Sequence, residues 1–355
     1  MPHITAVTTA LPPHEVTQAA ARMFASAFFG PHLTETARLL PVFDHAGVDR
    51  RYFSRPPEWF RAPRTFAEKN HTHLEAATAL GERACRSILE RCGLSPTDID
   101  AIFVVNSTGV ATPSLDAHLL HRLGMRRDAR RIPLWGLGCA GGVSGLAHAC
   151  QYLEGRPRER VLLLSLELCG LTFLSGDYSR ANLIACALFG EGAAAVIVEG
   201  DEIEGRREGP RIEFEGAYST HYPDSLDVMG WHVVDEGLQV VFAQRIPQIV
   251  RREAGGHFQG LLDRFGITRD DIDHYVLHPG GAKVLDAYQE TLALYDDDVA
   301  FSRSVLRDFG NMSSVTVLFV LQRLLESMDP RARGRAWLSA LGPGFSSESL
   351  LLRIG

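Results

Sequence analysis

The stretch GLSPTDIDAIFVV at residues 93–105 returns later in the chain as GITRDDIDHYVLH at residues 266–278. Each copy follows a helical pattern of apolar residues, at 80–92 and at 258–265, and ends in a short β-rich run before a glycine-bearing loop. The pattern therefore predicts helix, turn and strand twice. The two copies lie about 170 residues apart, which is too long a period for a solenoid repeat.

The duplication extends beyond these two stretches. LGCAG at residues 137–141 opens a helical pattern that runs to residue 153, and FGNMS at residues 309–313 opens one that runs to residue 327. Wholly apolar runs at 161–166 and 336–341 predict strands that are buried on both faces. The two helical patterns are apolar nearly all round, so we expect both helices between two sheets. The prediction is an α/β protein of five layers, α-β-α-β-α, built from duplicated halves at residues 1–205 and 206–355.

Composition excludes several classes of protein. The 355 residues are 45% hydrophobic and 22% charged, with a net charge of −7, so no basic surface for nucleic acid is expected. No signal peptide and no apolar stretch of about 18 residues is evident, which predicts a cytoplasmic protein without a membrane span. The six cysteines form no CxxC pair and no zinc spacing with histidine. We therefore expect free thiols and no metal.

Three residues in distinctive settings suggest covalent chemistry on a thioester. Cys139 lies among glycines in WGLGCAGG at a predicted helix start, where the helix N-terminus and a nearby imidazole would favour the thiolate. His278 follows an apolar run, at a predicted strand end where catalytic groups of α/β proteins project. Asn311 occupies the place of Cys139 in the second half. Its amide could donate hydrogen bonds to an oxyanion or to the enolate of a decarboxylated malonyl thioester.

Other interpretations of these residues remain open at this point. A Cys-His-Asn hydrolase would use Asn311 to orient His278, and Cys139 could be a buried structural cysteine. Residues 136–141 also match GxGxxG, with Glu167 after the next apolar run as a candidate acidic partner for a dinucleotide. The cysteine inside that loop, and a duplication unlike two Rossmann halves, argue against dinucleotide binding.

At the level of whole motifs, the chain resembles the type III polyketide synthases, the chalcone synthase-like branch of the thiolase superfamily. The resemblance covers essentially the whole chain and implies a thiolase-like fold. Residues 132–142 and LGPGFSSE at 341–348 are most similar to bacterial long-chain alkylpyrone synthases. The other motifs are STG at 107–109 with PS at 113–114, LELC at 166–169, ALFGEG at 187–192, HPGG at 278–281 and GNMS at 310–313.

The resemblance implies an iterative, homodimeric acyltransferase with no permanently bound cofactor. Cys139 would load a medium- or long-chain fatty acyl group from acyl-CoA, while His278 and Asn311 stabilise the enolate from malonyl-CoA and the oxyanion of condensation. The expected products are tri- or tetraketide alkylpyrones, or resorcinol-type products. A single condensation onto acyl carrier protein, as in a β-ketoacyl synthase III, is the alternative. A catalytically inactive acyl-binding scaffold is a third possibility.

The resemblance also implies residues around the substrate. Phe189 matches the aromatic gatekeeper between the CoA tunnel and the cavity, and Val240 aligns with a second gatekeeper that is phenylalanine in plant members, so a smaller residue there could open room for a fatty chain. Basic Arg50 and Arg51 are candidates for the CoA phosphates, although ordinary surface arginines are as good an interpretation. The remaining candidates are Gly280 and Gly281 for CoA, and Ser107, Thr108, Thr112, Cys169, Thr172, Ser313, Gly342, Pro343 and Gly344 for the cavity.

Overall fold

The two helix–turn–strand units form as the duplication predicts. A computed structural model describes residues 1–203 and 210–355. Helix α4 (Phe66–Cys92) ends at Gly93 and α8 (Ile246–Phe265) at Gly266, both glycines being left-handed with φ of 65° and 63°, a conformation that glycine adopts without strain. One turn later follow β4 (Ala101–Val105) and β11 (His274–Leu277). The predicted boundary between residues 205 and 206 lies outside the described residues.

Both halves contribute to a single sheet of nine strands in the described chain. The first half supplies five strands and the second half four, and they join where His3 and Ile4 pair with Glu213 and Ile212. The continuity at this edge was not predicted from the sequence. In spatial order the strands are β5 (Arg130–Leu134), β4, β6 (Arg160–Leu168), β7 (Glu191–Glu199), β1 (His3–Ala10), β8 (Ile212–His221), β13 (Ser346–Ile354), β12 (Gly334–Gly342) and β11.

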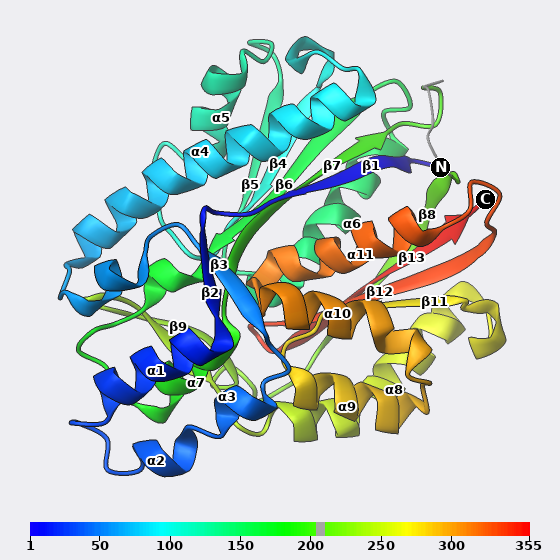
Figure 1. Cartoon of the computed structure of the whole chain (residues 1–355). Coiled ribbons are helices and arrows are strands. Elements are labelled where there is room, and N and C mark those ends of the chain that lie inside the picture. Colours follow the sequence, from blue (N-terminus) through cyan, green and yellow to red (C-terminus); the bar gives the residue numbers. More distant parts are fainter. Residues whose placement is uncertain (204–209) are drawn as a thin grey trace.

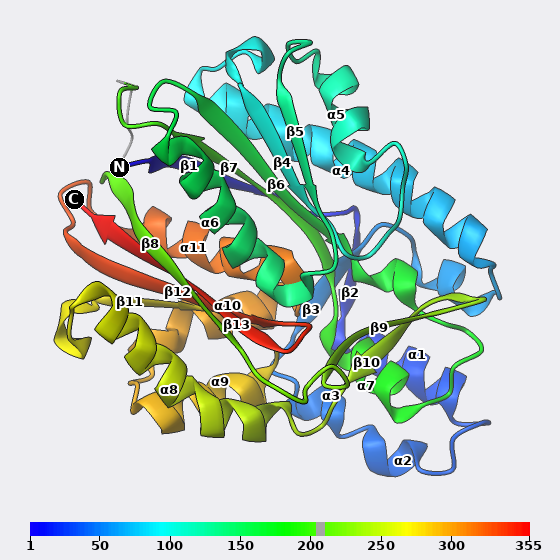
Figure 2. The ribbon, with the colours of Figure 1, turned by 180° about the vertical axis from the view of Figure 1, so that it is seen from behind.

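The two halves of the sheet enclose a pair of buried helices (Figures 1 and 2). Val143 and Leu146 of one helix and Val317 and Leu318 of the other are fully buried in a common core. This arrangement confirms the five layers and the burial of both helices. The inner helices are α6 (Gly141–Glu154) and α11 (Thr316–Ser327), and the outer faces carry α4 and α5 (Leu115–Leu123) on one side and α8 and α9 (Ala282–Leu292) on the other.

The N-terminal ends of the two inner helices approach each other closely. A Cβ added to Gly142 would lie 2.1 Å from the carbonyl oxygen of Ser314, so a side chain at this position would push the helices apart. Glycine allows the approach because it has no Cβ. The turn that carries Cys139 therefore meets the turn that carries Ser313.

A group of smaller elements lies at one end of the sheet, around helix α1 (Figure 1). Phe28 of α1 packs edge to face on Phe173, with ring centroids 5.2 Å apart. No helix of the described chain is long and apolar enough to span a bilayer. The elements are β2 (His14–Thr17), α1 (Gln18–Phe29), α2 (Thr36–Leu39), α3 (Val42–His45), β3 (Arg50–Phe53), α7 (Arg180–Leu188), β9 (Met229–Val234) and β10 (Gly237–Phe242), while α10 (Ala300–Phe309) precedes Asn311.

Candidate active site

Cys139 lies in a tight 3-10 turn, Gly138–Ala140, directly before α6. The turn requires glycine at position 138, where φ is +47° and a Cβ would lie 2.7 Å from the Cδ atom of Pro343. The Cys139 side chain is buried, and its Sγ is 3.6 Å from the Oγ of Ser313. The sulfur thus faces the equivalent turn of the second half, at the junction that the duplication predicts.

Burial dominates the acidity of this thiol. It raises the pKa of Cys139 to about 11, although hydrogen bonds with Ser313 and Asn311 lower it in part. Burial thus opposes the thiolate that the sequence led us to expect. The thiol must give up its proton when it attacks a thioester.

The Asn311 side chain is fixed by three hydrogen bonds, one of them a long one from Thr316 Oγ1 to Oδ1 at 3.5 Å. Its Oδ1 accepts from the backbone N–H of Ser313 at 2.8 Å, and its Nδ2 donates to the carbonyl of Gly280 at 3.2 Å. The residue lies just before the 3-10 turn Ser313–Val315 that leads into α11. The carboxamide also lies close enough to Cys139 to lower the pKa of its thiol. An uncharged donor therefore lies beside the sulfur.

The backbone of Asn311 is joined to the backbone on either side of Phe189. Its N–H donates to the carbonyl of Leu188 at 2.8 Å, and its carbonyl accepts from Gly190 at 2.9 Å. The sequence predicts Phe189 and Asn311 for the same site on separate grounds. In the structure their backbones form one short bridge between the end of α7 and the loop after α10.

His278 lies at the carboxyl end of β11 with its side chain buried. Neither ring nitrogen has a hydrogen-bond partner among the described residues. Burial lowers the pKa of His278 to about 3, so the imidazole is neutral at physiological pH. Gly280, whose carbonyl accepts from Asn311, also donates its N–H to the carbonyl of His278 at 3.0 Å. A neutral ring with two free nitrogens is suited to donate to, or accept from, a substrate.

Glu167 is a buried acid that sequence reasoning did not place in the site. Its carboxyl accepts from Ser107 N at 3.0 Å, Thr108 Oγ1 at 2.8 Å and Ser314 Oγ at 2.7 Å, so it connects the two halves behind Cys139. Burial raises the pKa of Glu167 to about 7 despite these donors. The sequence signal that could have identified Glu167 is a single charged residue at the end of an otherwise apolar strand.

An apolar pocket of about 440 Å³ has Phe189 and Cys169 in its lining, but none of Cys139, His278 and Asn311 lines it in the described chain. Four predicted substrate residues line it, namely Phe189, Cys169, Thr172 and Val240. The rest of its lining comes mainly from α1, α7 and the 3-10 turn Pro57–Arg61, and it includes four alanines and four further phenylalanines beside the charged Arg51, Glu58 and Arg61. These further walls carried no sequence signal. They are formed by Val16, Ala20, Phe24, Ala27, Phe53, Phe60 and Phe173.

Trp231 is a second residue that the sequence did not identify. It lines the pocket, and its Nε1 donates to the carbonyl of Ser107 at 2.9 Å. The indole on hairpin β9–β10 is thereby fixed beside the loop that follows β4.

The remaining cavity candidates have different surroundings. Gly342 packs on the Cys139 turn, since a Cβ there would lie 2.5 Å from the Cβ of Ala140, and Pro343 packs against Gly138. Gly344 is exposed. Thr112 is exposed and does not line the pocket of the described chain, in contrast to the prediction.

The predicted phosphate contact at Arg51 is wrong. Arg50 and Arg51 are neighbours on β3, whose residues alternate between two faces. Arg50 is exposed and remains a candidate. Arg51 is fully buried, and its guanidinium is already bonded to protein oxygens, so it cannot reach a phosphate at a tunnel mouth. Gly280 and Gly281 lie beside His278 and stay predictions for CoA binding.

Comparison with known proteins agrees with this geometry along the whole chain. Residues 3–202 match the model for the N-terminal domain of chalcone and stilbene synthases, and residues 213–354 match the model for their C-terminal domain. A putative chalcone synthase of Bacillus subtilis is 38% identical, with 99% of this chain and 98% of the relative covered. A 1,3,6,8-tetrahydroxynaphthalene synthase of Streptomyces peucetius is 41% identical, with 99% and 92% covered.

Solved structures show the same arrangement. The crystal structure of 1,3,6,8-tetrahydroxynaphthalene synthase from Streptomyces coelicolor, a bacterial type III polyketide synthase, superposes with a TM-score of 0.93 over 99% of both chains at 26% identity. The layers are therefore those of a known enzyme fold.

Proposed function

This chain belongs to the chalcone and stilbene synthase family and is a type III polyketide synthase, and from that premise we propose its substrate and products. Cys139 takes a medium- or long-chain fatty acyl group from acyl-CoA. The chain is then extended with malonyl-CoA and released as a tri- or tetraketide alkylpyrone, or as a resorcinol-type product. CoA thioesters are the substrates of the family.

In the proposed reaction Cys139 is the nucleophile, Asn311 donates a hydrogen bond, and His278 first accepts a proton and later donates a hydrogen bond. The Cys139 thiol attacks the acyl-CoA carbonyl, transfers its proton to His278 and displaces the CoA thiolate, which leaves as the thiol. Malonyl-CoA then loses CO2, and the electron pair of the broken bond moves onto the thioester oxygen. Hydrogen bonds from neutral His278 and from Asn311 stabilise that enolate. The enolate carbon attacks the acyl-cysteine carbonyl and releases Cys139.

The apolar pocket carries the proposal of a fatty acyl starter. It is lined by Cys169, Thr172 and Val240, by Phe189, whose chain neighbours are bonded to Asn311, and by four alanines and four further phenylalanines. Burial of alkyl chain against such walls stabilises the bound thioester by about 0.8 kcal/mol per CH2. A small polar starter would leave this volume unused.

Mass spectrometry of the products tests the proposal. Purified protein with malonyl-CoA and acyl-CoA thioesters of eight to eighteen carbons should give tri- or tetraketide pyrones. Products of a single condensation, or a requirement for acyl carrier protein, would favour the β-ketoacyl synthase III alternative. Tetrahydroxynaphthalene formed from malonyl-CoA alone would favour a second candidate, which the 41% identity to a synthase of that name supports.

Replacing Val240 with phenylalanine tests the role of the pocket directly. The phenylalanine side chain is larger than that of valine and should exclude long acyl chains, because overfilling a packed space is costly. We expect kcat/KM for a sixteen-carbon starter to fall about 10- to 100-fold while a short starter is little affected. Starter competition read by mass spectrometry measures the ratio, and an unchanged chain-length profile would count against the acyl pocket.

We also propose that the enzyme is a homodimer. Strand β5 is an edge strand of the described sheet, and Val110 and Trp135 near it are 49% and 53% exposed. An edge strand beside exposed apolar side chains is suited to a second copy. Light scattering on the purified protein checks the mass.

A further inference from the structure

Arg51 is the unusual buried charge of this molecule. Its side chain has no exposed surface, and no carboxylate pairs with it in the part of the chain that the structure describes. Burial lowers the pKa of Arg51 to about 10, which still leaves the guanidinium charged at neutral pH. A buried charge without a counter-ion must be compensated by dipoles, so the groups around it identify its role.

Those dipoles are the last carbonyls of α7. Arg51 Nη1 donates to the carbonyls of Cys186 at 2.5 Å and Phe189 at 3.3 Å, and Nη2 donates to Gln18 Oε1 at 2.6 Å. The end of a helix exposes carbonyls without intrahelical partners and carries partial negative charge, so a cation is favourable there. Gln18 in turn donates to the carbonyls of Phe43 and Ala187, at 3.0 and 3.1 Å. The pair therefore holds the end of α7 where Phe189 begins.

The stem of Arg51 reaches the Asn311 loop as well. A Cβ on Gly310 would lie 2.7 Å from Arg51 Cγ, so the loop before Asn311 lies directly on this side chain. The backbone of Asn311 is bonded to Leu188 and Gly190, on either side of Phe189. The buried Arg51 side chain therefore contacts both segments of this bridge, the one that carries Phe189 and the one that carries Asn311.

We propose that Arg51 is a positioning residue for the malonyl half-reaction: it holds the α7 carbonyls and the Gly310 turn, and so sets the Phe189 ring and the Asn311 amide relative to each other. The inference rests on the proposed roles of Phe189 and Asn311. Cys139 lies in the turn before α6, and neither the Arg51 hydrogen bonds nor its contact with Gly310 involves that turn. Loss of Arg51 should therefore impair enolate formation more than acyl loading.

The test separates the two half-reactions in Arg51→Met, which keeps a side chain of similar length without the charge. Acyl loading is followed by intact-protein mass after mixing with acyl-CoA. Malonyl-CoA decarboxylation is followed as acetyl-CoA formation. We expect decarboxylation to fall about 10- to 100-fold relative to loading, because small misplacement of catalytic groups costs rates of this size. Arg51→Lys should recover part of the loss, since an ammonium group can donate to one or two of the carbonyls.

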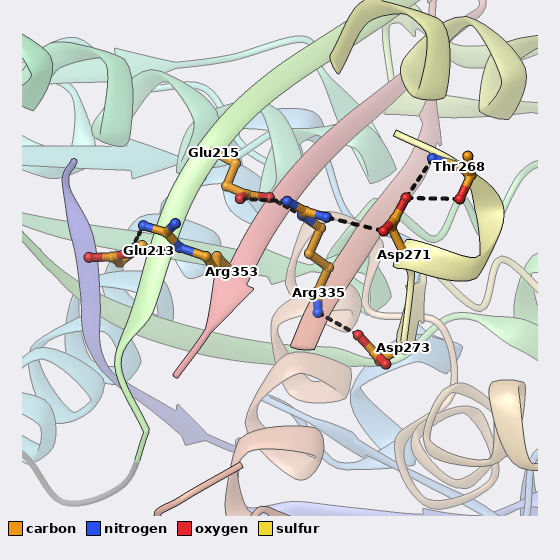
Figure 3. Close-up of polar contacts among 7 residues, drawn as sticks. All are labelled: Glu213, Glu215, Thr268, Asp271, Asp273, Arg335 and Arg353. Atoms are coloured by element: carbon orange, nitrogen blue, oxygen red, sulfur yellow. Dashed lines mark hydrogen bonds and ion pairs between the residues drawn. The ribbon is translucent and has the colours of Figure 1, made fainter. Parts of the chain in front are cut away.

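Arg335→Met serves as the matched control. Arg335 bonds Glu215 at 2.7 Å and lies beside Asp271 and Asp273 in an ion-pair network (Figure 3). It sits at the start of β12, about 20 Å along the strand from Gly342 at the site. This variant loses a partly buried arginine that does not contact the bridge between Phe189 and Asn311. Its ratio of decarboxylation to loading should therefore equal that of wild type.

Each outcome is informative. An Arg51→Met protein with the wild-type ratio, even if its melting temperature falls, would assign Arg51 a merely structural role and overturn the inference. If that variant does not fold, Gln18→Leu, which removes the Nη2 acceptor together with the donor to the Phe43 and Ala187 carbonyls, should show a smaller change in the same direction, and an unchanged ratio there would also overturn it. Failure of wild type to load any fatty acyl-CoA would instead refute the proposed starter, because malonyl-CoA decarboxylation is measured separately.

Discussion

At the scale of single residues, loss of the Cys139 thiol and loss of the Asn311 carboxamide should impair different steps of the reaction. Cys139→Ala removes the nucleophile but leaves Asn311 and its bonds to Gly280 and Ser313. We expect no acyl adduct on this variant, while malonyl-CoA decarboxylation continues. Asn311→Leu keeps the volume but removes the donor, so decarboxylation should fall about 100- to 1,000-fold. Intact-protein mass and acetyl-CoA formation measure the two effects, and an adduct retained in Cys139→Ala would place the nucleophile elsewhere.

The same residues show what the sequence could and could not predict. Cys139, His278 and Asn311 stand out because glycine and proline around them mark sharp turns at the ends of strands and helices. The adjacent arginines look equivalent in sequence, yet β3 turns one to solvent and one into the core. Which of the two is buried depends on the register of the strand against α7, and no local pattern reports that.

At the scale of elements, the proposed acyl pocket predicts that helix α1 limits the length of the starter. Ala20 of this helix lines the pocket, although the residue is exposed. Ala20→Trp should fill part of the pocket, because an aromatic side chain buries about 150–250 Å². We expect the longest accepted starter to shorten, with kcat/KM for sixteen- and eighteen-carbon thioesters falling about 10-fold or more and an eight-carbon starter unaffected. A panel of starter thioesters measures this profile.

Ala19→Trp provides the control on the same helix, since Ala19 is exposed and does not line the pocket. The two variants differ by one position, so they have similar helix propensity and similar effects on solubility. Equal profiles in both would show that the bound acyl chain does not extend to α1.

The sequence predicted helices and strands well from their periodicity. This pocket, however, is bounded by four segments that are distant in the polypeptide, and only their packing creates it.

At the scale of the whole molecule, the duplication predicted the five layers because helix, turn and strand signals recur in the same order in both halves. It did not predict that one continuous sheet joins them. That junction depends on two residues of β1 pairing with β8. Composition and periodicity predict which residues form strands. Which strands become neighbours in the sheet depends on backbone register and on a few polar side chains such as Glu199.

Glu199 tests whether polar side chains beside that junction stabilise the fold. It pairs with His3 in β1 and Arg160 in β6. Burial alone would raise its pKa, but hydrogen bonds from His3, Thr5 and Arg160 lower it from 4.5 to about 2. A pKa depressed in the folded state adds stability above the unfolded value, and this stability is lost as pH falls from about 4.5 towards 2.

We therefore expect Glu199→Gln to lower the free energy of unfolding by on the order of 1–3 kcal/mol at pH 7, the shift being discounted for partial solvent screening. The difference from wild type should stay constant down to about pH 5 and shrink towards pH 3. Denaturant titrations at pH 7, 5, 4 and 3 measure it. A difference that does not change over this range would mean that the Glu199 carboxylate charge does not stabilise the packing of β1, β6 and β7 beside the junction.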